Sequence, residues 1–154
     1  MNHSLSTSVR QMVKETFEGP PGEGSMFTES RPNSGLFGTL DQLTANEASI
    51  AVNGTTVAAH ADHTRFYLWG TNAILKDGKQ PKMDWGESWK INLVDEKQWN
   101  RIKEELRHEY LTLLEAIDVT EWNKLLANEI PGSLAHSAYH LGAIRQMLKV
   151  VKNS

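Results

Sequence analysis

The chain has 154 residues, which is the length of one ordinary domain, and we treat residues 1–154 as a single unit. Its formal net charge of −3 gives no electrostatic reason to expect a nucleic acid or an anionic membrane as a partner. The absence of cysteine excludes a disulfide framework, a thiolate metal site and a cysteine nucleophile.

The sequence has no apolar run of the ~18 residues that a membrane span needs. Its N-terminus, residues 1–10, is polar and lacks the apolar segment of a signal peptide. We therefore expect a cytoplasmic protein. A metal site in this chain would use imidazole, carboxylate or water as ligands, and thiol chemistry would need a thiol from outside.

Helical periodicity predicts one long helix and two short ones in the first third of the chain. Apolar residues at helical spacing predict a helix over residues 5–18, which Gly19-Pro20-Pro21-Gly22 ends. A long loop rich in Gly, Pro and Ser follows as far as Ser34. We expect a short helix over residues 36–43, and the capping box at 44–47 predicts another turn or two of helix.

The middle of the chain predicts a second long helix followed by an ordered loop. Asn53-Gly54 indicates a turn, after which either Thr55 or Thr56 caps a helix that runs to about Lys76. Residues 79–94 contain two tryptophans and no helical period. We expect this stretch to pack on the helices as a loop.

The last part of the chain predicts two more long helices. Asp95 caps the third, whose apolar stripe comprises Trp99, Ile102, Leu106, Tyr110, Leu113, Leu114 and Ile117. A short helix is expected over Thr120–Ala127, and Pro131 suits the first turn of a last helix that reaches about Val151. Four apolar stripes must be buried against one another, so the fold class is all-α, a four-helix bundle with short extra helices.

Two histidines share one face of the last helix. His136 and His140 are four residues apart, which places them one turn apart on the same side. That face continues through apolar residues, so both imidazoles are expected to point into the bundle. A pair with this spacing can place two imidazoles on one metal ion. Gly142 weakens the same helix by ~1 kcal/mol relative to alanine, which predicts a close approach of another helix beside His140.

The second long helix contains His60 and His63, three residues apart, and periodicity does not decide which of them faces the core. Asp62 and Arg65 lie on its more polar side, and His108 of the third helix is expected at the surface. A lone inward histidine is more often a hydrogen-bonded core residue than a ligand. Several inward histidines favour a metal, because one cation satisfies several acceptor nitrogens at once.

Two segments carry a resemblance to a known family. Residues 135–144 read AHSAYHLGAI, and residues 56–63 read TVAAHADH. They resemble the last-helix and second-helix motifs of the DinB-like superfamily of metal-binding four-helix bundles. In the family, a Thr or Ser stands seven residues before the metal histidine of the second helix, which implies His63 rather than His60. The loop at 84–89, DWGESW, also looks like members of this group, whereas Ala143 departs from the glutamine that relatives often carry.

The resemblance implies one divalent ion on His63, His136 and His140, with zinc, nickel and ferrous iron left open. His60 and Tyr139 are the residues that could support or replace a ligand, and His60 would be the fourth ligand of a closed site. The other residues expected near the ion are the tryptophans of the loop, Trp85 and Trp89, as a pocket wall.

Three chemistries remain open. The first is transfer of a low-molecular-weight thiol to a small-molecule electrophile, because relatives include bacillithiol transferases and mycothiol-dependent isomerases. The second is hydrolysis by a water molecule on the ion, for which Tyr139, Asp62 and Glu47 are the candidate bases. The third is a structural or sensing module without turnover. The resemblance also implies a homodimer.

Overall fold

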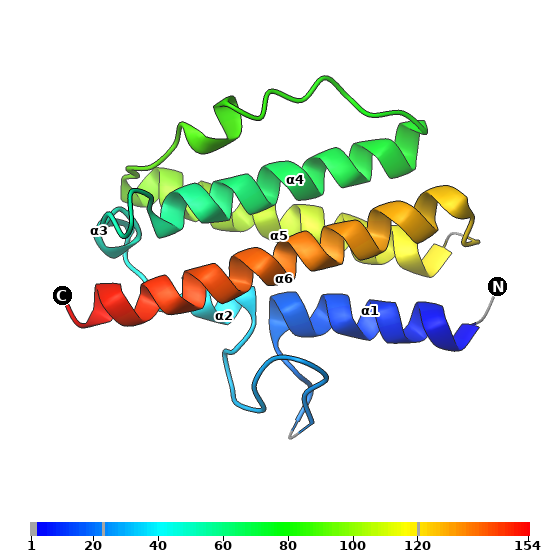
Figure 1. The fold of residues 1–154 in the computed structure, drawn as a ribbon, viewed down its shortest axis with the longest axis horizontal. Coiled ribbons are helices and arrows are strands. Elements are labelled where there is room, and N and C mark those ends of the chain that lie inside the picture. The colour runs from blue at the N-terminus through cyan, green and yellow to red at the C-terminus, as the bar shows by residue number, and fades with distance from the viewer. Residues whose placement is uncertain (1–2, 23, 120) are drawn as a thin grey trace.

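Figure 1 shows a computed structural model of the chain, which describes residues 3–22, 24–119 and 121–154. Its four long helices are α1 (His3–Glu18), α4 (Val57–Asp77), α5 (Glu96–Val119) and α6 (Lys124–Lys152). The connections contain α2 (Leu36–Leu40), α3 (Ala45–Ala48) and the 3₁₀ turn η1 (Glu87–Trp89). The long helices pack together as a bundle, so the prediction of an all-α bundle is confirmed. The loop at 79–94 lies between the second and third long helices, where it was expected.

A long crossover determines the directions of the helices. Residues 78–95 run back along the outside of α4, so that α4 and α5 begin at the same end of the bundle and run parallel (Figure 1). Helices α1 and α6 run in the opposite direction. Helix α4 packs against both α5 and α6, and η1 of the crossover packs against α4. Helix α4 is therefore covered on three sides.

Side-chain caps fix the end of this crossover that leads into α5. Thr56 is the residue that caps α4, since its Oγ1 accepts a hydrogen bond from the Ala59 backbone N–H at 3.1 Å. The same hydroxyl donates to the Asn92 carbonyl at 2.7 Å and so ties the crossover to the start of α4. Asp95 caps α5 as predicted, because its Oδ1 accepts from the Gln98 N–H at 2.7 Å.

The predicted boundary between two helices near Pro131 is wrong. Residues 124–152 form one helix, capped by Asn123, with Pro131 inside it; Thr120, the first residue of the expected short helix, lies outside the described residues. The apolar residues buried on either side of the proline are Leu126, Ile130 and Leu134. Their packing is continuous through the proline. The carbonyl that Pro131 cannot pair belongs to Ala127, an exposed residue, where water can replace the lost bond.

The core contains the stripe predicted for α5. Its buried members are Trp99, Ile102, Leu106, Tyr110, Leu113 and Ile117. Trp99 donates from its indole N–H to the Leu43 carbonyl at 3.0 Å, which joins α5 to the segment that follows α2. His108 is exposed, as expected. Across residues 3–22, 24–119 and 121–154, no helix combines the length and apolar character that a bilayer crossing needs.

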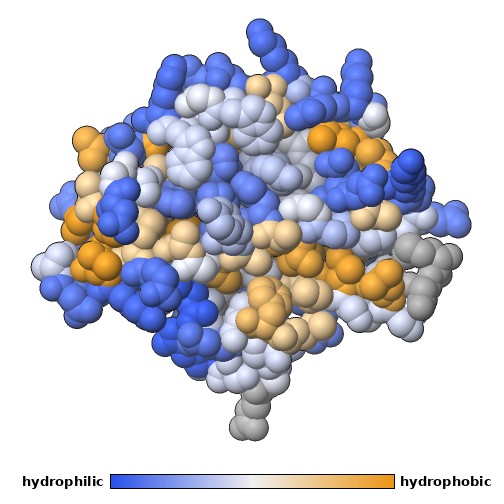
Figure 2. Space-filling model, viewed as in Figure 1, coloured by the Kyte–Doolittle hydropathy of each residue, from blue (hydrophilic) through white to orange (hydrophobic). Residues whose placement is uncertain are grey.

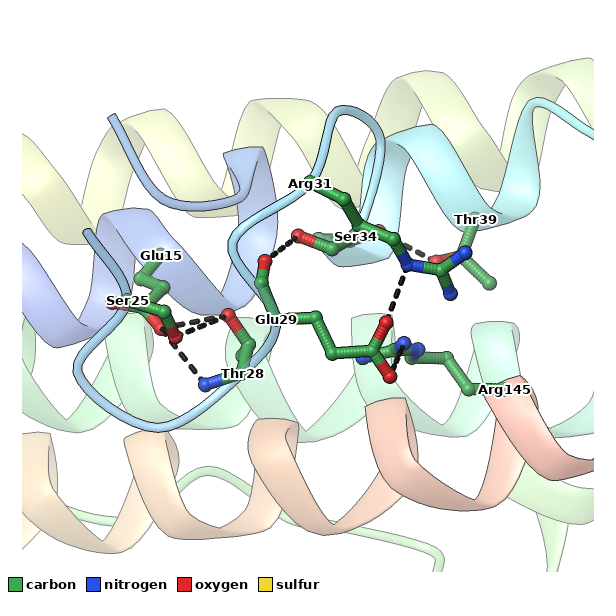
Figure 3. A network of polar contacts seen from close by, with 9 residues as sticks. Glu15, Ser25, Thr28, Glu29, Arg31, Ser34, Thr39 and Arg145 are labelled. Carbon is green, nitrogen blue, oxygen red and sulfur yellow. Dashed lines mark hydrogen bonds and ion pairs between the residues drawn. The ribbon is translucent and has the colours of Figure 1, made fainter. Parts of the chain in front are cut away.

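Glu15 organises the loop that follows α1. The residue is 1% exposed, and its carboxylate accepts five hydrogen bonds of 2.7–3.1 Å from Ser25, Met26, Phe27 and Thr28. Figure 3 shows Ser25 and Thr28 beside Glu15. Burial raises the pKa of this carboxyl, but the hydrogen bonds from Thr28, Met26 and Phe27 outweigh it and lower the pKa to about 2. The loop is therefore attached to α1 through an ionised buried carboxylate.

This attachment predicts a specific loss of stability in acid. Because the folded-state pKa lies below the ordinary value of 4.5, Glu15 stabilises the fold fully above pH 4.5, and the stabilisation is lost as the pH falls towards 2. The two and a half pKa units correspond to on the order of 3 kcal/mol. Denaturant unfolding at about pH 6 and about pH 3 should therefore show a smaller pH dependence for Glu15→Gln than for the wild type.

Glu115→Gln is the matched control, because Glu115 is an exposed glutamate of α5. It should retain the wild-type pH dependence. Equal losses of unfolding free energy for the wild type and Glu15→Gln would contradict the assignment.

Candidate metal centre

Three imidazoles from two helices meet inside the bundle. Helix α4 contributes His63, which is 7% exposed, and α6 contributes His136 and His140 from successive turns. Because α4 and α6 run antiparallel and pack along their lengths, His63 lies opposite the α6 pair. One ring nitrogen from each residue lies within 4.8 Å of the other two. The structure thus brings together the three histidines that the sequence singled out.

The spacing of these nitrogens suits a shared ion. His136 Nε2 lies 3.1 Å from His63 Nε2 and 3.2 Å from His140 Nε2. Two nitrogens on one tetrahedral zinc ion, each at about 2.0–2.1 Å, lie about 3.3 Å apart. The two distances from His136 therefore match those between ligands of one ion.

Ser88 of the crossover determines which ring nitrogen of His63 carries the proton. Ser88 Oγ donates its only proton to the Trp85 carbonyl at 2.8 Å, so it must accept the hydrogen bond that joins it to His63 Nδ1 at 2.9 Å. His63 consequently carries its proton on Nδ1. Its Nε2 presents a lone pair to the other two imidazoles, which is the form that binds a metal.

His60 lies outside the three-nitrogen cluster. Its Nδ1 is 2.9 Å from His140 Nδ1, so it contacts the side of the His140 ring that faces away from His136. With His140 Nε2 used as a ligand, Nδ1–H of His140 donates to His60. His60 then fixes the orientation and tautomer of a ligand, as hydrogen-bond acceptors behind metal-bound histidines do.

All four imidazoles are neutral at neutral pH. Burial lowers the pKa of His140 to about 3, and repulsion from His136, His63 and His60 in their protonated forms adds to the effect. Burial and the charge of His63 lower the pKa of His136 to about 4. Burial is also the main cause of the lowered pKa of His60 and His63. Their lone pairs are therefore available to a cation without prior loss of a proton.

Aromatic rings enclose the cluster. Trp89 stacks on His63 with ring centroids 4.1 Å apart and planes at 19°, and Tyr67 stacks on His136 at 3.8 Å and 13°. Trp85 lies farther out, 6.3 Å from His63, and lines a cavity of about 130 Å³ together with Tyr67. Trp85 and Trp89 are 43% and 40% exposed, so the crossover covers the histidines but leaves this side in contact with solvent.

Two of the three proposed bases, Asp62 and Glu47, are engaged by other residues, and the third, Tyr139, is largely exposed beside His140. Asp62 was expected on a polar face, but its side chain is only 6% exposed and pairs with Arg65 at 2.8 Å. The expectation is wrong because α5 covers this face of α4, where Arg65 also approaches Glu105 at 3.6 Å. Glu47 is held in the capping box with Thr44. Tyr139 is 74% exposed, with its ring against the edge of His140.

Sequence reasoning missed two residues of the site, Ser88 and Tyr67. Tyr67 stands four residues after His63, and this helical spacing was a usable signal. Ser88 had no such signal, since its position depends on the 3₁₀ turn η1. That turn begins where Asp84 Oδ1 accepts from the Gly86 and Glu87 N–H groups at 3.0 and 3.1 Å.

No protein-family model, curated protein or solved structure matches this chain. Among the described residues, the cluster of His63, His136 and His140 is the one group of three or more potential ligands that could hold a metal ion. The case for a metal centre therefore depends on its geometry.

The tautomer assignment is open to a direct test. In metal-free protein at neutral pH, long-range ¹H–¹⁵N correlation spectra of the imidazoles should show His63 protonated at Nδ1, because Ser88 can only accept from it. Ser88→Ala should remove this preference. A His63 protonated at Nε2 in the wild type would contradict the hydrogen-bond assignment.

Proposed function

We propose that the protein is a DinB-like, metal-dependent enzyme in which His63, His136 and His140 hold one divalent ion. Its substrate would be a low-molecular-weight thiol, activated for transfer to an electrophile. A bound ion with an open coordination position lowers the pKa of a thiol, so that the thiolate forms at neutral pH. Zinc, nickel and ferrous iron all accept imidazole ligands.

The convergence of three neutral imidazoles carries this proposal. One proton on His136 Nε2 can serve only one of its two contacts, at 3.1 and 3.2 Å, while His63 Nε2 has no proton to offer. Hydrogen bonds alone therefore leave the cluster poorly satisfied. A cation accepts all three lone pairs at once.

The donor set supports an open rather than a closed site. His60 is the residue that would complete a set of four protein ligands. Its Nδ1 instead lies 2.9 Å from His140 Nδ1, on the far side of the His140 ring. Within residues 3–22, 24–119 and 121–154, no carboxylate joins the three-nitrogen group. Three protein ligands are typical of catalytic zinc, whereas structural zinc has four. This contrast favours an enzyme over a structural module.

The surroundings favour a thiol over water as the reacting group. Hydrolysis needs a base that removes a proton from water. Asp62 is engaged by Arg65, and Glu47 by Thr44 and Lys152. A bound ion lowers the pKa of its water to about 7 but deprotonates a coordinating thiol outright, so a thiol depends less on such a base. The rings of Trp89 and Tyr67, which stack on two of the histidines, would offer apolar surface to a thiol substrate.

Metal content tests the centre itself. Untagged protein purified without chelators should contain about one equivalent of zinc, nickel or iron by elemental mass spectrometry. His136→Ala/His140→Ala should lose it, since two of three ligands are gone. His108→Ala, which alters an exposed histidine of α5, should retain the metal. Wild-type protein that stays metal-free after incubation with zinc and nickel would refute the proposal.

Thiol binding tests the substrate class separately. Cobalt-loaded protein should develop a sulfur-to-metal charge-transfer absorption when cysteine or dithiothreitol is added, because the open position accepts a thiolate. The His136→Ala/His140→Ala variant should not develop it. If cobalt binds but no thiol produces the band, the thiol assignment is wrong although the metal centre stands.

The hydrogen bond from His63 to Ser88 should contribute to metal affinity. Ser88→Ala should weaken zinc binding by roughly 10-fold, the lower end of the effect of removing a group that orients a histidine ligand. Ser133→Ala is the matched control, because it removes a buried hydroxyl that has no partner in the described part of the chain. Competition with a chromophoric chelator measures both affinities. An equal change in the two variants would contradict an orienting role.

A further inference from the structure

A second, strongly cationic cavity lies on another face of α6. It has a volume of about 410 Å³ and is bounded by the C-terminal half of α6, by α2 and by the loop at 29–33. Its cationic lining residues are Arg31, Arg145, Lys149 and Lys152. Figure 2 shows strongly hydrophilic residues gathered at the lower left of the molecule, where these segments lie.

This cavity is separate from the histidine cluster. Arg145 follows His140 by five residues, which at 100° a residue places it about 140° around the helix from that ligand. None of His60, His63, His136 and His140 lines the cavity. A ligand here would therefore contact none of the imidazoles.

The cavity has an excess of positive charge. Glu29 pairs with both Arg31 and Arg145 (Figure 3), and Lys152 pairs with Glu47 at 2.8 Å. Four cations against two carboxylates leave a local charge of +2, although the whole chain has a net charge of −3. This local positive charge is opposite in sign to the net charge of the chain, and it attracts anions.

Gly142 affects the shape of this cavity. It lies inside α6 and lines the cavity, and a Cβ built at this position would meet nothing within 4 Å among the described residues. The close helix approach expected from the sequence is therefore wrong. Glycine weakens a helix interior and has no packing role here. It leaves the floor of the cavity free of a side chain.

We propose that this cavity binds a small organic anion, through a phosphate or carboxylate group that displaces Glu29 from Arg31 and Arg145. The Arg145 side chain is only 15% exposed, so its guanidinium is already held in place for a bidentate contact. The Glu29 side chain is 52% exposed and can move out into solvent. Its backbone need not follow, because Ser34 Oγ holds the Glu29 carbonyl at 2.9 Å.

Glu29 would thus act as an internal competitor for the anion. Glu29→Gln should tighten anion binding by about fivefold or more, since apparent affinity scales with the fraction of molecules whose arginines are free. If Glu29 instead only anchors its loop, the substitution would lower the thermal midpoint and leave anion affinity unchanged. The two roles are therefore distinguishable in one variant.

Isothermal titration calorimetry with inorganic phosphate, pyrophosphate and succinate tests the proposal on the full chain. Binding of the phosphates and not succinate, or the reverse, identifies the anionic group. Arg145→Gln and Gly142→Leu should abolish the heat of binding, the first by removing the guanidinium and the second by filling the floor. Arg101→Gln, an exposed arginine of α5 outside the cavity, should bind as the wild type does.

Three results would overturn the proposal. The first is the absence of binding to both the wild type and Glu29→Gln at millimolar anion. The second is binding that survives Arg145→Gln, which would place the anion elsewhere. The third is unchanged affinity in a folded Glu29→Gln. Should Glu29→Gln fail to fold, as judged by circular dichroism, Arg145→Gln and Gly142→Leu still decide the outcome.

Discussion

The antiparallel contact between α4 and α6 is the interaction on which the candidate centre depends. It places His63 against two successive turns of α6, buries His63 and His140, and leaves His136 partly buried. Burying neutral imidazoles is unfavourable unless each nitrogen finds a partner. The His63–Ser88 and His60–His140 pairs satisfy the outer nitrogens of His63 and His140. Nδ1 of His136 has no partner among the described residues, and the inner nitrogens face each other. The bundle thus holds three imidazole nitrogens close together, and a cation would stabilise this arrangement.

The crossover between α4 and α5 completes the arrangement from outside. It brings Ser88 and Trp89 against His63, and Thr56 fixes its far end to the start of α4. Because the crossover spans the length of α4, it also makes α4 and α5 parallel (Figure 1). One connection therefore sets both the helix order and the tautomer of His63. A shorter connection would give an antiparallel hairpin and leave His63 without its partner.

The features that could be predicted are those that depend on the spacing of residues within one helix. The four-residue interval between His136 and His140, together with the apolar residues that follow, correctly placed both imidazoles inside the bundle. The sequence failed where burial depends on a distant element. Asp62 lies on the polar side of α4 when that helix is considered alone. In the fold, α5 covers Asp62, and Glu105 of α5 approaches its partner Arg65. Likewise Pro131 looks like a helix start, because packing on both sides of it is not visible locally.

Helix α6 contributes to both the histidine cluster and the cationic cavity, and this shared element does not by itself couple them. Coupling requires a ligand that interacts differently with two conformations of the protein. The loop that carries Glu29 is attached to α1 by the buried Glu15 carboxylate, so displacement of Glu29 needs movement of its side chain alone. His140 and Arg145 point to different faces of a helix that packs against its neighbours along its length. An anion in the cavity should therefore change the electrostatic potential of α6 without changing the distances among the three imidazoles.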